Sequence, residues 1–575
     1  MKFRTLLTAS ALLTQYALWS QGESLGQIKL EVIGSYKANI EDAQKLNDLP
    51  RTEDTTRSRI PVKFEIKPII LPTDYTPEPL RPAKITKTAV EPIPRTFLRA
   101  GAGLYTTPLL EFRYDSDRSR NNAFGASFNH YSTRTGVRKI LFDNNGLSTT
   151  RGLVYYRHFF SNYSLGATSH LTYDRVKYYG LPDYGLPPLD TFTIGNPAVQ
   201  SYLISTTRVD AMRLTPVRTF AMSNLGFRFD FLRDRYNIAE FHASLPIDFE
   251  LARNDNRNLK VQLAYEHMQH YNTIDANALA FQANTFRIRP FMNFSNNNLT
   301  FDLGLNMVLS NYQRNNLITI PGYEKEPDEV YFFIFPEARF KVPLIADVLE
   351  FDGFLKYDFQ LNTLQSLSRS WLFITPGIEL DYTQKIRGQI GMSGLIFPGA
   401  SFHLNAGYID WKNLPIFYRN PFFYKTPDAI KGVEVLYLDG TQVPLQAKLS
   451  VKLTKSIDAE GIVNFNHYEM KRQQAWHLPR WRNEIKLKYS NGDAFDIGMD
   501  VFFIGERVAF DQALNTEINA ILKPYTDANL HFNYHYSKQM SFFLSINNMF
   551  FNHYEHYLGY HAQQFLALAG VVYKL

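Results

Sequence analysis

A period-two alternation of apolar and polar residues constrains the fold of this chain more than any other feature. Leu303 and Leu305 alternate with Asp302 and Asn306, and the same kind of alternation recurs from Phe97 onward. Because successive side chains of a β-strand point to opposite faces, each such segment predicts a strand with one apolar and one polar face. The chain is therefore predicted to be all-β.

The closing stretch FLALAGVVYKL separates two all-β architectures. One face of the predicted strand carries only apolar or aromatic side chains: Phe565, Ala567, Ala569, Val571, Tyr573 and Leu575. A soluble sandwich also alternates, but its terminal strand rarely ends on an outward hydrophobic residue. A transmembrane barrel does so, because its closing strand meets lipid on one side and the lumen on the other. We therefore expect a large antiparallel transmembrane β-barrel.

The barrel is expected to span residues 96–575. A spanning strand needs about 9–11 residues, which gives about 22 strands, within a range of about 14 to 22. Short turns are predicted at Ser161–Tyr163, Asp234–Asn237 and Gln384–Gly388, and long loops at Gly180–Thr206 and Lys412–Val433. Short turns at one end and long loops at the other are typical of outer-membrane barrels, with the turns in the periplasm.

The composition of the 575 residues agrees with this architecture. Aromatic residues make up 15%, which suits aromatic girdles at two membrane interfaces, while the mean hydropathy of −0.27 excludes a helical membrane protein. Cysteine is absent, so disulfides, cysteine zinc sites and thiol nucleophiles are excluded. The net charge of +6 is small for this length and argues against a nucleic-acid partner.

Two N-terminal segments precede the predicted barrel. Met1–Ser20 has a basic start and a mostly apolar core, which predicts a secretory signal peptide. Residues 21–95 hold nine prolines, which exclude regular strand from most of this segment. We expect an extended periplasmic segment. It is either a linker or a tether that docks on a partner or folds into the lumen.

No constellation predicts catalysis, a cofactor or a metal. His553, His556 and His561 cluster in sequence, but their spacing is not that of HExxH, and polar lining near a rim is the alternative interpretation. No nucleophile elbow or nucleotide-binding glycine motif is present, so we predict that the protein is not an enzyme. Gly101 and Gly103 are expected to relieve crowding in a curved strand.

Lysines on predicted lumen faces raise the question of ion selectivity. Lys448, Lys452, Lys486 and Lys488 would form a basic stripe if their strands were neighbours, and such a stripe selects anions. The alternative is an ordinary solvated or partner-covered lumen wall.

The closing strand also carries a candidate functional motif. Val571, Tyr573 and Leu575 on one face, with Gly570 nearby, fit a signal read by the barrel-assembly machinery through strand addition. The alternative is that these residues are only lipid-facing girdle residues, and both roles are compatible.

Several stretches resemble the barrel domain of TonB-dependent receptors of the type found in Bacteroidetes. The resemblance rests on Trp476–Gly492, Asn547–Tyr560 and Ala569–Leu575, and upstream on Arg99–Phe112, which looks like the barrel start of a related group. It implies an integral protein of the outer membrane. Such receptors carry a plug domain of well over a hundred residues, whereas about 75 residues lie between signal peptide and barrel here. The resemblance therefore implies a plugless relative.

Two classes of function remain open. The missing plug favours a subunit or scaffold of an outer-membrane complex for protein assembly or secretion. The alternative is a solute-transporting receptor or a porin-like channel. The expected partners are outer-membrane lipid, the barrel-assembly machinery during biogenesis, and outer-membrane or periplasmic proteins that bind the N-terminal segment and loops.

Overall fold

The structure is a computed structural model, and it describes residues 94–575 with internal gaps. The gaps are residues 118, 138–144, 181–197, 216–218, 255–256, 273–277, 297–298, 315–327, 419–431, 493 and 512–517. The chain divides into two units, Met1–Thr88 and Ala89–Leu575. The predicted signal peptide and nearly all of the Pro-rich segment lie outside the described residues, so only the second unit is described here.

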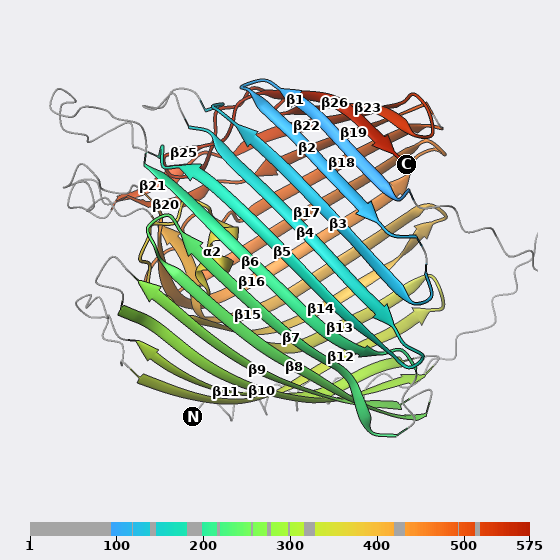
Figure 1. Ribbon diagram of the computed structural model, residues 1–575, viewed down its shortest axis with the longest axis vertical. Coiled ribbons are helices and arrows are strands. Elements are labelled where there is room, and N and C mark those ends of the chain that lie inside the picture. The colour runs from blue at the N-terminus through green and yellow to red at the C-terminus, as the bar shows by residue number, and fades with distance from the viewer. Residues whose placement is uncertain are drawn as a thin grey trace, which may run out of the picture. The chain divides into compact units, whose positions relative to one another are not determined.

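Twenty-two strands form one antiparallel sheet that closes on itself, in agreement with the predicted barrel and strand number (Figure 1). Each barrel strand pairs with the next along the chain, and β26 pairs with β1. The barrel strands are β1 (Thr96–Gly103), β2 (Thr107–Asp115), β3 (Asn122–Thr133), β4 (Leu147–Phe159), β5 (Tyr163–Lys177), β6 (Val199–Arg213), β7 (Ala221–Asp234), β8 (Ala239–Asn254), β9 (Arg257–Asn272), β10 (Ala278–Asn296), β11 (Leu299–Arg314), β12 (Asp328–Ile345), β13 (Leu349–Leu361), β14 (Tyr382–Phe397), β15 (Ala400–Tyr418), β16 (Glu434–Lys452), β17 (Ile457–Met470), β18 (Trp481–Asn491), β19 (Phe495–Ile504), β22 (Tyr525–His535), β23 (Met540–Asn547) and β26 (Leu566–Lys574).

Among the described residues, four short strands and one helix lie in the connections. The hairpin of β20 (Arg507–Asp511) and β21 (Ile518–Leu522) lies between β19 and β22. A smaller pair, β24 (Glu555–Tyr557) and β25 (Tyr560–His561), lies between β23 and β26. The helix α2 (Leu364–Ser370) lies between β13 and β14. Within the described residues, no helix is both long and apolar enough to cross a membrane.

The seam between β1 and β26 brings the two ends of the barrel together. The Thr96 N–H donates to the Leu575 carbonyl at 3.0 Å, and the Leu575 N–H donates to the Thr96 carbonyl at 2.9 Å. Tyr573 and Leu575 are exposed, at 37% and 56%, whereas Val572, which precedes Tyr573, is buried. The predicted closing strand with its outward apolar face is therefore confirmed.

The predicted turn at Ser161–Tyr163 is confirmed, because β4 ends at Phe159 and β5 begins at Tyr163. The two predicted long loops lie largely outside the described residues, and their described ends, residues 199–206 and 412–418, are strand rather than loop. Two further predictions are corrected. Gln384–Gly388 is not a turn but lies within β14, where Lys385 and Arg387 face the lumen; a polar run was mistaken for a turn. Asp234–Asn237 is a short turn, but it lies at the end of the long loops. Its compactness follows from Asp234, which accepts N–H bonds from Tyr236 and Ile238 at 2.9 and 2.8 Å.

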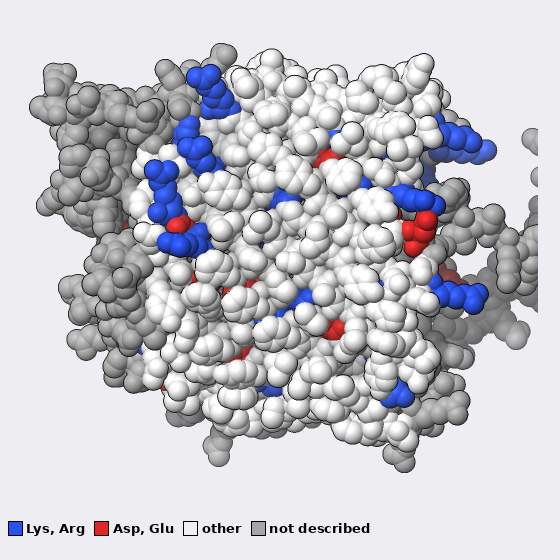
Figure 2. Space-filling model, viewed as in Figure 1, with Lys and Arg blue, Asp and Glu red and all other residues white. Residues whose placement is uncertain are grey.

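The two faces of the wall differ as the alternation predicts. Leu303 and Leu305 are exposed at 45% and 42%, whereas Asn306, which follows Leu305, is buried. On the face shown in Figure 2 the wall is mostly uncharged, and most visible charged side chains lie near its two ends. A closed barrel with an apolar outer band is the architecture of an outer-membrane protein, with short turns toward the periplasm.

Candidate functional site

The described interior contains a folded segment at the end of the long loops, which we call the inner loop (residues 362–381). Its helix α2 begins with a capping box: Thr363 Oγ1 accepts from the Ser366 N–H, and Ser366 Oγ accepts from the Thr363 N–H, both at 3.0 Å. The carboxylate of Glu240 on β8 accepts from the N–H of Leu364 at 2.5 Å and of Gln365 at 3.3 Å. A buried carboxylate thus satisfies the free N–H groups at the positive end of the helix.

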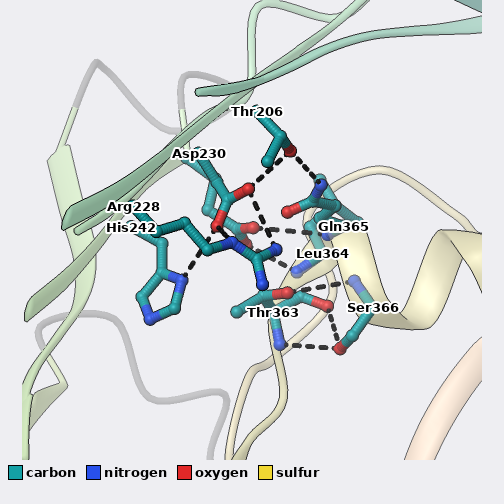
Figure 3. Close-up of polar contacts among 9 residues, drawn as sticks. Thr206, Arg228, Asp230, His242, Thr363, Leu364, Gln365 and Ser366 are labelled. Carbon is teal, nitrogen blue, oxygen red and sulfur yellow. Dashed lines mark hydrogen bonds and ion pairs between the residues drawn. The ribbon is translucent and has the colours of Figure 1, made fainter. Parts of the chain in front are cut away.

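A second network joins the same helix to β6 and β7 (Figure 3). The Gln365 side-chain amide donates to Thr206 Oγ1 at 3.4 Å, and the Thr206 hydroxyl donates to Asp230 Oδ1 at 2.5 Å. Asp230 is buried and is balanced by Arg228, whose Nε lies 2.7 Å from Oδ2, and by His242 at 3.3 Å. The network fixes the helix against the wall.

The far end of the inner loop is held by a buried ion pair. Arg314 on β11 donates to Asp381 Oδ1 at 2.9 Å, and both side chains are almost fully buried. In the middle of the loop, Ile374 forms a parallel bridge with Val433, and the Tyr178 hydroxyl donates to the Ile374 carbonyl at 2.5 Å. The inner loop is therefore attached to the wall at its start, middle and end.

Aromatic side chains from three connections stack over the inner loop. This lid cluster consists of Tyr179, Trp371, Phe373, Tyr557 and Tyr560. The rings of Trp371 and Tyr557 lie 3.7 Å apart, those of Phe373 and Tyr560 4.5 Å, and those of Tyr179 and Phe373 5.4 Å. The Tyr179 hydroxyl also donates to the His561 carbonyl at 2.9 Å. Stacked rings bury apolar area, so the cluster packs the inner loop against the other two connections at the loop end of the barrel.

His477 links β15 to the lid cluster. Its Nδ1 lies 2.9 Å from the Phe417 carbonyl, and its Nε2 accepts from the Leu558 N–H at 3.3 Å. These bonds require a neutral ring with the proton on Nδ1. Burial lowers the pKa of His477 to about 4, and the nearby cation of Arg507 acts in the same direction. Burial likewise lowers the pKa of His556 to about 4.

The periplasmic half of the lumen differs from the loop end. Inward-facing charged side chains are half exposed there, for example Lys341 at 54%, Lys486 at 48% and Asp500 at 42%. A cavity of about 730 Å³ adjoins the walls of β16 to β22. Its charged and imidazole lining comprises Lys452, Asp458, Glu460, Lys486, Lys488, Asp496, Asp500 and His531.

The predicted basic stripe does not form. Its lysines lie on β16 and β18, and β17 runs between them with Asp458 and Glu460 on the same face. Glu460 Oε2 lies 2.9 Å from Lys448 Nζ, so the wall alternates in sign.

The histidine cluster is brought together only in part. The rings of His553 and His561 lie 4.2 Å apart, and His561 Nε2 lies 3.3 Å from Glu555. The carbonyl of His556 accepts from Arg507 at 2.7 Å. No group of three or more metal-ligating side chains is found in the part of the chain that the structure describes.

The proposed assembly-signal residues lie on β26. Val571, Tyr573 and Leu575 share the outward face, whereas Gly570 faces inward beneath the ring of Phe543. Their role as a signal stays a prediction.

The attachment of the inner loop was not predicted from the sequence. Glu240, His242 and Asp230 are inward residues of ordinary alternating strands, and alternation reports only which face they occupy. A capping pattern in TLQS was the available signal for α2, but its Ser at the fourth position is a weaker signature than Glu or Gln. The partner carboxylate lies 124 residues away along the chain.

Comparison with solved structures places this fold in a known class. The chain resembles the FrpB iron transporter from Neisseria meningitidis with a TM-score of 0.62 and 11% identity over 84% of this chain and 81% of that one. It resembles the ferric enterobactin receptor PfeA from Pseudomonas aeruginosa, solved with enterobactin, with a TM-score of 0.60 and 10% identity over 84% and 81%. It likewise resembles the ferric-catecholate import receptor Fiu from E. coli, with a TM-score of 0.60 and 11% identity over 84% and 82%.

These likenesses concern the fold. No protein-family model matches the sequence, and no curated protein matches it. The chain has the 22-stranded barrel fold of TonB-dependent receptors and is an outer-membrane β-barrel protein. The solved structures that it resembles are transporters and receptors rather than enzymes.

Proposed function

We propose that the protein is a solute-transporting barrel with a receptor-like, gated lumen. The observation that carries this proposal is the contrast within the lumen. The periplasmic half presents half-exposed charges such as Lys486 and Asp500, whereas the loop end is closed by the inner loop and the lid cluster. A wet conduit with one closed end suits a gated pathway, because half-exposed charged side chains on a lumen wall are stabilised by water.

The sequence favoured a subunit or scaffold of an outer-membrane complex, and transport was the alternative. The comparisons support the alternative better, since the similar structures are an iron transporter, a ferric enterobactin receptor and a ferric-catecholate import receptor. Ferric chelates are therefore the first solutes to test. The mixed signs around the 730 Å³ cavity favour polar or zwitterionic solutes over a simple anion or cation.

Conductance of the purified protein in planar bilayers tests this proposal. We expect a low, flickering conductance for the wild type. A larger conductance is expected for Glu240→Gln, because the substitution removes the charge that holds α2. Glu250→Gln on the same strand serves as the control, since Glu250 lies opposite Lys260 near the periplasmic end. Silence of wild type and Glu240→Gln alike, together with co-purifying proteins, would favour the subunit function.

We also propose that Met1–Ser20 is removed on export and that residues 21–95 stay in the periplasm as a binding segment for outer-membrane or periplasmic proteins. The proline content of that segment supports an extended chain suited to docking. Mass spectrometry of the mature protein from outer membranes would locate the cleavage. A pull-down with and without residues 21–93 would show whether partners depend on the segment.

A further inference from the structure

The pairing between β12 and β13 stops halfway up the wall. The register ends at Ala338 opposite Leu355, although β12 continues to Asp328 and β13 continues to Leu361. β12 itself stays paired with β11 as far as Asp328. Within the described residues, no strand pairs with the other edge of residues 328–337. That edge therefore presents N–H and C=O groups without a ladder partner, which is a template for another strand.

The end of β13, which we call the β13 tip (residues 356–361), turns into the lumen instead. The Tyr357 carbonyl accepts from Asn306 at 3.0 Å, and the Phe359 carbonyl accepts from Arg287 at 2.9 Å. The donors are inward side chains of β11 and β10. Tyr357 and Phe359 are 3% and 5% exposed, so the tip occupies the outer half of the lumen.

Aromatic rings line the inner side of this seam. The ring of Tyr357 lies 5.5 Å from Phe335 and 6.0 Å from Phe333, and Phe359 lies 5.6 Å from Tyr382. Phe333 and Phe335 alternate with the exposed Phe332 and Ile334 along β12, so they face inward. The tip has therefore placed its apolar face on the inner surface of the wall.

Apolar and polar residues nevertheless alternate along β13 without a break, including at the point where the strand bends into the lumen. Leu355, Tyr357, Phe359 and Leu361 share one face, and Lys356, Asp358 and Gln360 share the other. Leu355, where the pairing ends, is exposed on the outside of the wall. The tip thus carries the pattern of a spanning strand whose apolar face meets lipid.

If the β12–β13 register continued for six more residues, residues of like character would lie opposite one another on both the lumen face and the outer face of the wall. Glu337 would lie opposite Lys356, which pairs opposite charges on the lumen side. Ile334 would lie opposite Phe359, and Phe332 opposite Leu361, which joins apolar residues on the outer side. Ile334 and Phe332 are already 55% and 64% exposed on that side. Cross-strand pairs of these kinds stabilise a sheet.

We infer that the open edge of β12 (residues 328–337) is a docking site for the β13 tip, which alternates between the lumen and this edge. Docking on the edge completes the ladder and withdraws Tyr357 and Phe359 from the lumen. The lumen position is held by the Arg314–Asp381 ion pair and by the Glu240 contact with α2. We further expect docking to open the conduit, and this expectation rests on the proposed transport function.

Disulfide trapping tests the docking, and the absence of native cysteine makes the chain suited to it. The pair Glu337→Cys and Lys356→Cys is predicted to cross-link only when the tip occupies the edge. Lys341→Cys with Asp352→Cys is the matched control, because these residues are already opposite one another and lie four residues along the same ladder. We expect full cross-linking of the control pair and partial cross-linking of the test pair. Asp381→Asn should raise the test yield several-fold by releasing the tip.

Three outcomes decide whether the tip docks on the edge, and a fourth separates docking from the proposed conduit function. Cross-linking of the test pair within one chain, increased by Asp381→Asn in a barrel that keeps its heat-dependent gel mobility, supports it. No cross-link in either background, while the control pair reacts fully, overturns it. Cross-linking of Glu337→Cys between two chains also overturns it, because the edge would then bind a second copy. If the intramolecular cross-link forms but does not raise bilayer conductance, docking stands and the conduit function fails.

Discussion

Gly101 of β1 lies directly opposite Gly570 of β26 at the seam that closes the barrel, and the ring of Phe543 covers both. A Cβ atom on Gly570 would lie 2.1 Å from the Ala100 carbonyl oxygen and 2.7 Å from the Phe543 ring. The expected role of Gly101 in relieving crowding is confirmed, since its own Cβ would lie 2.8 Å from Phe543. The guanidinium of Arg99 also lies over the Phe543 ring, with its central carbon 4.0 Å from the ring centroid.

Gly570→Ala should therefore destabilise the closure. Overpacking of this kind costs about 1–3 kcal/mol, and here the nearest atoms belong to backbone that cannot move without disturbing the seam. The measurement is the urea midpoint for loss of heat-dependent gel mobility. Gly461→Ala on β17 is the control, because a Cβ there meets no atom within 4 Å. Equal midpoints for the two variants would show that the seam tolerates a side chain.

The assembly-signal hypothesis predicts a kinetic defect in Tyr573→Ala. If the assembly machinery reads the outward face of β26, insertion into liposomes that contain the machinery should slow several-fold, while unassisted folding in detergent should change little. Tyr534→Ala on β22 is the matched control, since Tyr534 is also an exposed outward tyrosine. A similar slowing in both variants would indicate that these residues act only as girdle aromatics.

Glu240→Gln should loosen the inner loop without unfolding the barrel. Removing the charge at the N-terminus of α2 costs about 0.5–2 kcal/mol, because a neutral amide accepts these N–H bonds less strongly. Hydrogen exchange of residues 364–370 should become faster. Exchange in β1 and β26 should stay unchanged, and unchanged exchange in α2 would contradict the assigned role of Glu240.

Acid should open the lid. His477 and His556 have a pKa of about 4 in the folded lid, below the ordinary value of 6.5, so the open lid binds protons more readily. The lid contacts are therefore fully stable above about pH 6.5 and weaken as the pH falls toward 4, by about 3 kcal/mol per histidine.

Acrylamide quenching of tryptophan fluorescence measures this opening. Quenching should rise between pH 7 and pH 4.5, because Trp371 separates from Tyr557 when the lid opens. Trp371→Phe should remove most of the rise. A profile that is the same in His477→Gln and in the wild type would exclude His477 as the group responsible.

The sequence predicted the barrel because a lipid-facing wall imposes a period of two on every strand. Leu303, Asn306 and Tyr573 all lie on the faces that this period assigns them. The same period could not reveal the path of the β13 tip. The apolar face of Tyr357 and Phe359 is satisfied equally by lipid or by the rings of Phe333 and Phe335, and alternation does not distinguish these surroundings.

The contacts of the candidate site could not be predicted from the sequence for a related reason. Its contacts join positions far apart in the chain, such as Glu240 with Leu364 and Arg314 with Asp381, and each partner looks like an ordinary polar lumen residue. The basic stripe required the strands of the lysines to be neighbours, but β17 with Asp458 lies between them, which fits the alternative of an ordinary lumen wall. Which lysine-bearing strands are neighbours can be predicted only if the hairpins between them are counted correctly.

The tight turn at Asp234–Asn237 makes the outer rim of the barrel uneven. Only four residues connect β7 to β8 there, whereas twenty residues connect β13 to β14. Glu240, the anchor of α2, lies two residues into β8 from that low stretch of rim. A bulky molecule that reaches the lumen over β7 and β8 would therefore meet Glu240 soon after crossing the rim, and its polar groups would compete with α2 for that carboxylate.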